Sequence, residues 1–600
     1  MSVQTLSELF LVATGHDLPD CLRHKVGDSW RSVSSQELAD RVRRLSAALG
    51  SLGVRRGDRV ALMAENGVHW PTVDFATLCI GAVTVPIYPT LTADQAAFVA
   101  NDCGARVLFV DGKERLDAML GERDSLPQVE TFVLIGGDSA DPSIKTLDSM
   151  IENSEPMPAA EFEAEARKAQ PDDLATFIYT SGTTGKPKGV MLTHNNLASN
   201  AQAALARSEL QKGWVALSFL PLSHVFERTV DYVYFLQGVS IAYAESVQVV
   251  AQNLLEINPH TFVSVPRVYE KVLAKVHESV AASSPLKQKI FAWAEEIAAQ
   301  ALPYRLRREW PPGLLGVQLK VADALVFSKL RSRFGTRFRY AVSGGAPLAA
   351  DLAKFFWGAG LEIYEGYGLS ETSPVLTVNA PFMVKMGTVG TVVEGTELKI
   401  AEDGEILARG PQIMRGYYNL PDATAEAIDG DGWFHTGDIG EIDADGYLKI
   451  TDRKKEIIVN AYGKNVAPAP IENALKASRF IEQAVVIGDQ RKFLAALLVP
   501  NFEALKSWAA QKGLSEEDPP ALLDMPDVRQ LFASEVETVN NKLARYERVR
   551  TWELLPTEFT IETGELTPTQ KVKRRVIDKK YIDVIDQMYE GAKGQPTEWK

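Results

Sequence analysis

Short apolar runs alternate with amphipathic stretches along most of the chain. The amphipathic spacing predicts helices, for example at residues 35–52 and 195–210. The apolar runs predict short strands at residues 59–64, 81–88, 107–110, 132–135, 174–179, 262–265 and 338–342. Strands that alternate with helices are typical of doubly wound sheets. The pattern therefore predicts an α/β fold for the greater part of the sequence.

The pattern of apolar and polar residues changes after Gly387. Residues 389–408 form short alternating segments separated by glycine turns, which favour a small antiparallel sheet or a barrel-like part. The polar stretch at 451–456 then separates this part from a compact tail with an α+β pattern. We predict a large N-terminal domain at 1–451 and a small, mobile C-terminal domain at 452–600.

Composition and charge exclude several classes of protein. Of the 600 residues, 46% are apolar and 24% are charged, which is typical of a globular chain that needs no disulfides for stability. A net charge of −14 argues against nucleic acid as a partner. Cys21, Cys79 and Cys103 lie far apart without metal-ligand spacing, so neither a disulfide framework nor a zinc site is expected. This cysteine usage favours a reducing compartment.

The sequence also bears on targeting and membranes. Residues 1–20 lack a basic region followed by a long apolar run, so we expect no signal peptide. The longest apolar candidate, at 75–88, is too short to span a bilayer and contains Thr and Pro. We expect a cytoplasmic protein, with a peripheral place on the inner face of a membrane as an open alternative.

One segment departs from the acidic charge of the whole chain. Residues 284–340 contain eleven basic and four acidic residues, together with Trp293, Tyr304 and Trp310. Apolar residues recur in this segment at helical spacing. Two interpretations stay open: a solvated helical insertion, or a patch that docks on an anionic membrane surface, as basic amphipathic helices do.

A loop at residues 179–189 has the composition of a phosphate-binding loop. Its glycines allow the backbone to turn tightly and to present N–H groups to an anion. Four hydroxyl groups and two lysines add donors and positive charge. The loop is not a Walker A motif, because two residues instead of four separate Gly182 from Gly185, and Pro187 follows the lysine.

Three later segments have residues that suit a nucleotide. Residues 343–347 follow a predicted strand and precede a helix, a place where a flat ligand can approach closely. Tyr367 lies between glycines and can lie flat against a base, while Ser370 and Glu371 suit an α-phosphate and a divalent cation. The carboxylate of Asp438 can accept hydrogen bonds from both hydroxyls of a ribose.

With these segments in this order, nearly the whole chain resembles the adenylate-forming superfamily of acyl-CoA synthetases, luciferases and peptide-synthetase adenylation domains. The resemblance implies that Tyr367 stacks on adenine, Asp438 holds the ribose and Ser370, usually Thr in the family, touches the α-phosphate. It implies a Mg²⁺ ion held by Glu371 and Thr180. The residues that it implies for ATP binding are Thr180, Ser181, Gly182, Thr183, Thr184, Gly185, Lys186, Lys188, Gly344, Gly345, Ala346, Pro347, Glu365, Gly366, Tyr367, Gly368, Ser370, Asp438, Arg453 and Lys455.

The resemblance extends into the tail. Asp452 matches the family's hinge residue, about which the C-terminal domain turns. Tyr462 and Gly463 match a loop that lines the CoA thiol tunnel. Lys571 matches the catalytic lysine, a mobile charge suited to neutralising a carboxylate and an α-phosphate as they join. The basic residues just after it, Lys573, Arg574 and Arg575, are expected to form a solvated face, with contact to the phosphates of CoA as a lesser alternative.

Other segments bear on the choice of acid. Residues 220–228 resemble the motif that closes the acyl pocket, with His224 beside the substrate carboxylate. This run has no Asp to hold an ammonium group, which weighs against amino acids. Residues 265–271 and the long insertion resemble the long-chain branch. Arg228 stands about where some long-chain enzymes have a gating Trp, which departs from that pattern.

The resemblance implies a long-chain fatty acid–CoA ligase. Such an enzyme uses ATP and Mg²⁺ to form an acyl-AMP, and then transfers the acyl group to CoA with release of AMP. Three alternatives stay open: a ligase for an aryl or medium-chain acid, a ligase that loads an acyl carrier protein, and a catalytically silent relative that binds nucleotide or lipid.

Overall fold

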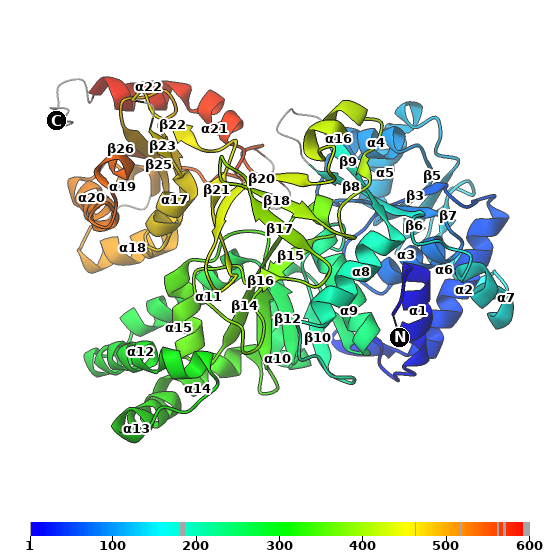
Figure 1. The fold of residues 1–600 in the computed structure, drawn as a ribbon, viewed down its shortest axis with the longest axis horizontal. Coiled ribbons are helices and arrows are strands. Elements are labelled where there is room, and N and C mark those ends of the chain that lie inside the picture. The colour runs from blue at the N-terminus through cyan, green and yellow to red at the C-terminus, as the bar shows by residue number, and fades with distance from the viewer. Residues whose placement is uncertain are drawn as a thin grey trace.

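The computed structural model describes residues 2–180, 187–462, 464–514, 519–560, 563–567 and 572–591. Figure 1 shows a large body, blue to green along the chain, and a smaller tail in yellow to red that stands beside it. No helix within the described ranges has the length and apolar character needed to cross a bilayer.

The first large sheet has eight strands and contains the five strands predicted before residue 180. The strands from β8 to β7 are parallel, and their order reverses at β3, as in a doubly wound sheet. In spatial order the strands are β19 (Gly416–Tyr417), β9 (Lys188–Thr193), β8 (Leu174–Thr180), β4 (Val83–Ile87), β3 (Arg59–Met63), β5 (Ala105–Asp111), β6 (Thr131–Ile135) and β7 (Lys145–Thr146). Its helices are α2 (Ser35–Ser51), α3 (His69–Cys79), α4 (Ala93–Asp102), α5 (Lys113–Gly121), α6 (Leu147–Glu152) and α7 (Ala159–Ala166).

Three strands of this sheet were not predicted, and they are β7, β19 and β9. β9 begins directly after the glycine-rich loop and pairs antiparallel with β8, so that Thr180 lies opposite Lys188. The helix predicted at 195–210 follows it as α8 (His194–Leu205). The two ends of the loop are therefore held together by a strand pair.

The second large sheet has nine strands, of which those from β14 to β1 are parallel. In spatial order they are β16 (Thr391–Val392), β15 (Val375–Val378), β14 (Glu362–Gly368), β13 (Tyr340–Ser343), β12 (Thr261–Ser264), β10 (Val215–Ser218), β11 (Ser240–Tyr243), β1 (Leu22–Val26) and β2 (Ser29–Val33). Between the two sheets lie α1 (Leu6–Gly15), α8 and α9 (Val225–Gln237), which share one hydrophobic core with strands of both sheets (Figure 1).

The other face of the nine-stranded sheet is covered by helices that include the basic insertion. They are α10 (Val250–Ile257), α11 (Pro266–Ala281), α12 (Pro285–Leu306), α13 (Gly313–Ala322), α14 (Ser328–Arg331) and α15 (Ala350–Gly358). A π-helical turn, η3 (Asp323–Phe327), joins α13 to α14. The insertion is helical as predicted, and its inner side belongs to a second hydrophobic core.

An antiparallel sheet follows, as the alternation at 389–408 predicts. Its strands are β17 (Glu397–Ile400), β18 (Glu405–Arg409), β20 (Phe434–Ile442) and β21 (Leu448–Arg453), and α16 (Pro421–Ala427) lies between β19 and β20 in the chain. The domain boundary predicted at Asp452 falls inside β21, where Asp452 pairs with Ile439.

The tail is α+β and has hydrophobic cores of its own. Its strands are β22 (Ile458–Val459), β23 (Asn465–Val466), β24 (Ile481–Ile487), β25 (Leu494–Pro500) and β26 (Val549–Leu554). Its helices are α17 (Pro468–Lys476), α18 (Phe502–Gln511), α19 (Pro519–Leu522), α20 (Pro526–Asn540), α21 (Arg574–Lys580) and α22 (Ile582–Gly591). An ion pair between Arg267 of α11 and Glu482 of β24 joins the tail to the large body.

All three cysteines of the chain are buried and none forms a disulfide. Burial raises the pKa of the Cys21 thiol to about 11 and that of Cys103 to about 12. The pKa of Cys79 is raised by burial as well. The cysteines are therefore packed as core residues.

Candidate active site

Three predicted nucleotide-binding residues meet where β14 ends beside the antiparallel sheet. The Tyr367 hydroxyl donates a hydrogen bond of 2.6 Å to Oδ2 of Asp438. Nε of Arg453 donates to the other oxygen, Oδ1, at 3.1 Å. The pairing of β20 with β21 sets Arg453 directly opposite Asp438. Both carboxylate oxygens of Asp438 are therefore engaged, and its side chain is buried.

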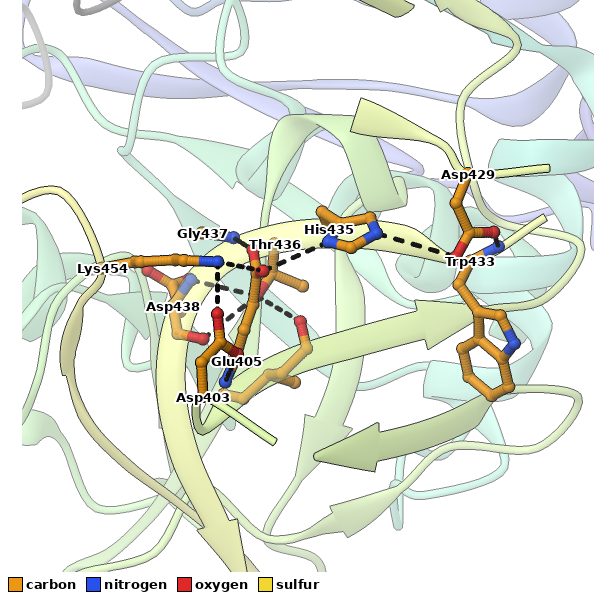
Figure 2. A network of polar contacts seen from close by, with 10 residues as sticks. Asp403, Glu405, Asp429, Trp433, His435, Thr436, Gly437, Asp438 and Lys454 are labelled. Atoms are coloured by element: carbon orange, nitrogen blue, oxygen red, sulfur yellow. Dashed lines mark hydrogen bonds and ion pairs between the residues drawn. The ribbon is translucent and has the colours of Figure 1, made fainter. Parts of the chain in front are cut away.

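A polar network beside Asp438 fixes the start of the linker to the tail. Figure 2 shows Lys454 reaching Glu405, whose Oε2 lies 2.8 Å from its Nζ. Oε1 of Glu405 accepts a hydrogen bond of 2.9 Å from the backbone N–H of Gly437. Burial opposes ionisation of Glu405, but the bonds from Lys454, His435 and Gly437 outweigh it and lower the pKa of its carboxyl group. Glu405 carries no motif signal and was not among the predicted residues.

A second cluster gathers the described ends of the glycine-rich loop. Lys188 lies opposite Thr180, and its Nζ stands 4.9 Å from the centre of the Tyr417 ring. The Tyr417 hydroxyl donates to Oε1 of Glu371 at 2.9 Å. Thr180, Lys188 and Glu371 are thus brought together through Tyr417, which was not among the predicted residues either. The other loop residues of the prediction, Ser181, Gly182, Thr183, Thr184, Gly185 and Lys186, lie outside the described residues.

The segment predicted to face adenine packs against the acyl-pocket motif. A side chain on Gly344 would place its Cβ 2.8 Å from the ring of Phe226, so a larger residue there would have to displace that ring. Gly345, Ala346 and Pro347 follow and are exposed. His224 precedes α9, and its Nδ1 accepts a hydrogen bond of 3.1 Å from the backbone N–H of Phe226. The predicted adenine and carboxylate sites are therefore neighbours.

The strand β14 supplies the remaining predicted contacts of this region. A Cβ on Gly368 would lie 1.7 Å from the carbonyl oxygen of Pro374, so the close approach of two backbones requires glycine. Gly366 and Ser370 are half-buried. Glu365 is buried, and burial raises the pKa of its carboxyl group to about 8. Glu365 therefore carries its proton at neutral pH.

The predicted hinge residue is buried at the end of β21. Asp452 is 5% exposed, and its Oδ1 accepts a hydrogen bond of 2.6 Å from the backbone N–H of Arg453. Its Oδ2 has no hydrogen-bond partner within the described part of the chain. Burial raises the pKa of this carboxyl group to about 6. Lys455, two residues beyond the strand end, is exposed.

Three further site residues were predicted beyond the linker, and they are Tyr462, Gly463 and Lys571. Tyr462 lies between β22 and β23, and its side chain is 54% exposed. Gly463 and Lys571 lie outside the described residues. Leu566 pairs with Val572 in an isolated β-bridge, so the segments just before and just after residues 568–571 lie side by side.

Arg574 does not lie on a solvated face, and that expectation was wrong. Its guanidinium contacts Oε1 of Glu472 at 2.7 Å and Oε2 of Glu456 at 3.5 Å. It also donates to the carbonyl oxygen of Val486 at 3.1 Å. Arg574 is mostly buried, because it compensates a carboxylate of α17 that is itself buried. It joins the start of α21 to the linker.

Arg228, at the position compared with a gating Trp, is a fixed core residue. Its guanidinium pairs with the carboxylate of Asp74, and both side chains are buried. It also donates to the Tyr232 hydroxyl at 2.8 Å and to the Thr176 hydroxyl at 2.7 Å. The ring of Trp70 lies 5.3 Å from the guanidinium. These contacts hold Arg228 inside the core between the two large sheets.

Comparisons with known proteins agree with this geometry. The family model described as AMP-binding enzyme matches residues 17–418, and the model described as AMP-binding enzyme C-terminal domain matches residues 455–593. A protein of Mycobacterium tuberculosis (strain ATCC 25618 / H37Rv) named long-chain-fatty-acid–CoA ligase FadD15 is 41% identical over 93% of this chain and 92% of its own length. The mouse long-chain-fatty-acid–CoA ligase ACSBG1 is 31% identical over 95% of this chain and 84% of its own length.

Solved structures share the fold. The anthranilate CoA ligase AuaEII in complex with anthranoyl-AMP matches with a TM-score of 0.74 and 21% identity, over 97% of this chain and 98% of that one. A Mycobacterium tuberculosis fatty acyl CoA synthetase matches with a TM-score of 0.62 and 23% identity, over 97% and 99%. The family models cover most of the sequence in the order of the observed body and tail. The chain therefore belongs to the AMP-binding, adenylate-forming enzyme family.

Proposed function

We propose that this chain is a long-chain fatty acid–CoA ligase, which converts a fatty acid, ATP and CoA to acyl-CoA, AMP and pyrophosphate. The observation that carries the proposal is the meeting of Tyr367, Asp438 and Arg453, since an aromatic ring, a carboxylate and a guanidinium suit a nucleoside. Relatives that match this chain almost end to end are named long-chain-fatty-acid–CoA ligases, which supports the acid and the acceptor.

In the first step, a carboxylate oxygen of the fatty acid attacks the α-phosphorus of ATP, and the bond to pyrophosphate breaks. Asp438 and Arg453 hold the ribose, with the Tyr367 ring against the base. Lys188 and the loop that it closes bind the β- and γ-phosphates. Lys571 offsets the charge of the carboxylate and the α-phosphate as they meet. The enzyme acts by positioning and electrostatic stabilisation, without a covalent enzyme intermediate.

The donor set fits a magnesium ion. Mg²⁺ takes oxygen ligands and is commonly held by one or two protein oxygens plus substrate phosphates. Glu371 offers a carboxylate and Thr180 a hydroxyl on elements that Tyr417 and Lys188 join. No cluster of three or more potential metal-ligating side chains occurs in the described ranges, which suits an ion that arrives with ATP. When bound, Mg²⁺ neutralises phosphate charge.

In the second step, the sulfur of CoA attacks the acyl carbonyl carbon, the bond to AMP breaks and the thiol proton passes to solvent. The tail turns about Asp452 between the steps, which withdraws Lys571 and brings Tyr462 and Gly463 to the site. The ion pair of Arg267 with Glu482 joins the body to the tail, so the turn separates these residues.

The test is thioester formation by the purified protein with ATP, Mg²⁺, CoA and a series of acids from acetate to octadecanoate, plus benzoate, read by mass spectrometry. We expect the maximum at tetradecanoate or a longer acid. A maximum at a short or aromatic acid would keep the mechanism and overturn the substrate class. Acyl-AMP without thioester would point to an acyl carrier protein as the acceptor.

We further propose that the enzyme works at a membrane surface. A long-chain fatty acid is sparingly soluble and partitions into bilayers, because each buried methylene contributes roughly 0.8 kcal/mol. A ligase for such an acid gains access to its substrate at the lipid surface. The basic insertion at 284–340 supports this location by its charge.

A further inference from the structure

One side of helix α13 presents large aliphatic side chains to solvent. Leu314 is 72% exposed, Val317 61% and Val321 46%. Leu325, in the π-helical turn that continues the helix, is 46% exposed. Spacings of three and four residues put these side chains on one face of a helix. We refer to these four residues as the α13 stripe.

The opposite side of the same helix is also apolar, and it is covered. Leu319 and Ala322 are fully buried and belong to the core that contains α12. A helix that is apolar on both sides is normally covered on both. Figure 1 shows α13 at the outer tip of the large body, beyond α12 and α14. The α13 stripe therefore lacks a cover within the described part of the chain.

The insertion that carries the stripe is rich in exposed cations. Seven of them form no ion pair with another described residue, and they are Lys287, Lys289, Lys320, Lys329, Arg333, Arg337 and Arg339. Of these, Lys320 lies on α13 itself. Trp310 precedes α13, is 54% exposed and has the Arg305 guanidinium 5.4 Å from its ring centre. Tryptophan is enriched at the interface between lipid and water. An apolar stripe on a basic insertion that also exposes a Trp matches an anionic lipid surface in both chemistry and charge.

We propose that the α13 stripe docks the enzyme on an anionic lipid bilayer, with the helix in the plane of the headgroups. A helix of ten residues is far too short to span the bilayer, so it lies on the surface. A second copy of the chain is the weaker candidate, because a twofold interface would set one basic insertion against another. The inference rests on the proposed function only for the biological purpose of docking, which is to bring the enzyme to a surface that contains its fatty acid substrate.

The test is co-sedimentation of the full chain with vesicles, without ATP, acid or CoA. One set of vesicles contains phosphatidylglycerol and phosphatidylcholine in equal parts, and the other contains phosphatidylcholine alone. The stripe variant is Leu314→Asn with Val317→Asn. Its matched control is Val247→Asn with Leu255→Asn, two aliphatic residues of similar exposure, 57% and 55%, on other elements.

The charge variant is Lys287→Gln with Lys320→Gln and Lys329→Gln. Its control is Lys506→Gln with Lys512→Gln and Lys542→Gln, three exposed lysines of the tail. We expect the wild type and both controls to bind the anionic vesicles and to be released at high salt. The stripe variant should bind at least about tenfold more weakly. Each lysine removed from the insertion should cost about fivefold.

Several outcomes overturn the proposal. They are absence of binding, equal binding to both kinds of vesicle, or equal binding by the stripe variant and its control. A wild-type dimer in light scattering that the stripe variant converts to a monomer would assign the stripe to a second copy instead. Thioester formation from a water-soluble medium-chain acid is measured for every variant. If the stripe variant loses vesicle binding but retains activity, the result supports docking. If the protein binds vesicles but forms no thioester, the result contradicts only the ligase assignment.

Discussion

The hydroxyl of Tyr367 and the carboxylate of Asp438 are in hydrogen-bond contact at 2.6 Å, although 71 residues separate them in the chain. Arg453 occupies the other carboxylate oxygen from the neighbouring strand. The groups that we propose to bind the nucleoside are thus oriented by one another before substrate arrives. Such preorganisation reduces the loss of side-chain entropy on binding.

Tyr367→Phe tests the value of that contact. The substitution keeps the ring but removes a hydrogen bond to a charged group, worth about 1.5–3 kcal/mol, so we expect KM for ATP to rise about tenfold or more. The turnover number should change little. Pyrophosphate release measures both. Tyr447→Phe, in the turn between β20 and β21 of the sheet that carries Asp438, is the control, and an equal effect there would contradict the role of the contact.

Lys571→Ala separates the two half-reactions. In the proposed mechanism the charge of Lys571 is needed where carboxylate and α-phosphate join, so adenylate formation should fall about 100-fold or more. Conversion of supplied acyl-AMP and CoA to thioester should continue, because the proposed turn of the tail withdraws the lysine before that step. Equal loss of both steps would show that Lys571 does not act in the first step alone.

Arg574→Ala tests a positioning role for the anchor of α21. Arg574 contacts Glu472 and Glu456 and starts the helix three residues after Lys571. Its loss should slow adenylate formation more than thioester formation from acyl-AMP, without a change in KM for ATP. Lys579→Ala, an exposed lysine of the same helix, is the control. Restoration of the ratio of the two rates by Arg574→Lys would indicate that charge alone suffices.

Asp452 predicts a dependence of stability on pH. Burial raises its pKa to about 6 from an ordinary value of 3.8, so the folded chain binds this proton more tightly than the unfolded chain. The contribution of Asp452 to stability therefore falls as pH rises from about 4 to about 6 and stays low above that. The variant Asp452→Asn does not ionise. Its melting temperature relative to wild type should rise across this window, and a constant difference would refute the assignment.

The buried pair of Arg228 and Asp74 predicts strong coupling. Arg228→Met leaves a buried carboxylate uncompensated and should lower the free energy of unfolding by about 3–5 kcal/mol. Addition of Asp74→Leu should recover most of that loss. Urea denaturation measures both variants. Arg167→Met, which breaks an exposed pair with Glu163, should cost less than about 1 kcal/mol.

The sequence pattern predicts the parallel strands well, because buried strands in such sheets are continuous apolar runs. It did not predict β9, since Lys188–Thr193 follows a glycine-rich loop directly and its pairing with β8 is what makes it a strand. Tyr417 was not predicted as a site residue for a related reason. It reaches Glu371 through the pairing of β19 with β9, which joins segments more than 200 residues apart.

The family prediction is confirmed by the matching models, whereas the residue roles stay predictions. Charge runs are usually solvated, and that rule failed at Arg574 because a buried carboxylate, Glu472, lies opposite it. No local pattern reveals such a partner 102 residues away in the chain. The meeting of Tyr367 with Asp438 was implied by resemblance alone, since their spacing carries no signal.

The burial of all three cysteines has a practical consequence. An acyl-AMP is an acylating agent, yet the protein offers it no accessible thiolate, so the thiol of CoA meets no internal competitor. For the same reason maleimide dyes should leave the native chain unmodified. One cysteine introduced at an exposed position, such as Lys320 on α13 or Lys506 on α18, would be the single labelling site. Fluorescence experiments on the turning of the tail could then begin from an otherwise unaltered sequence.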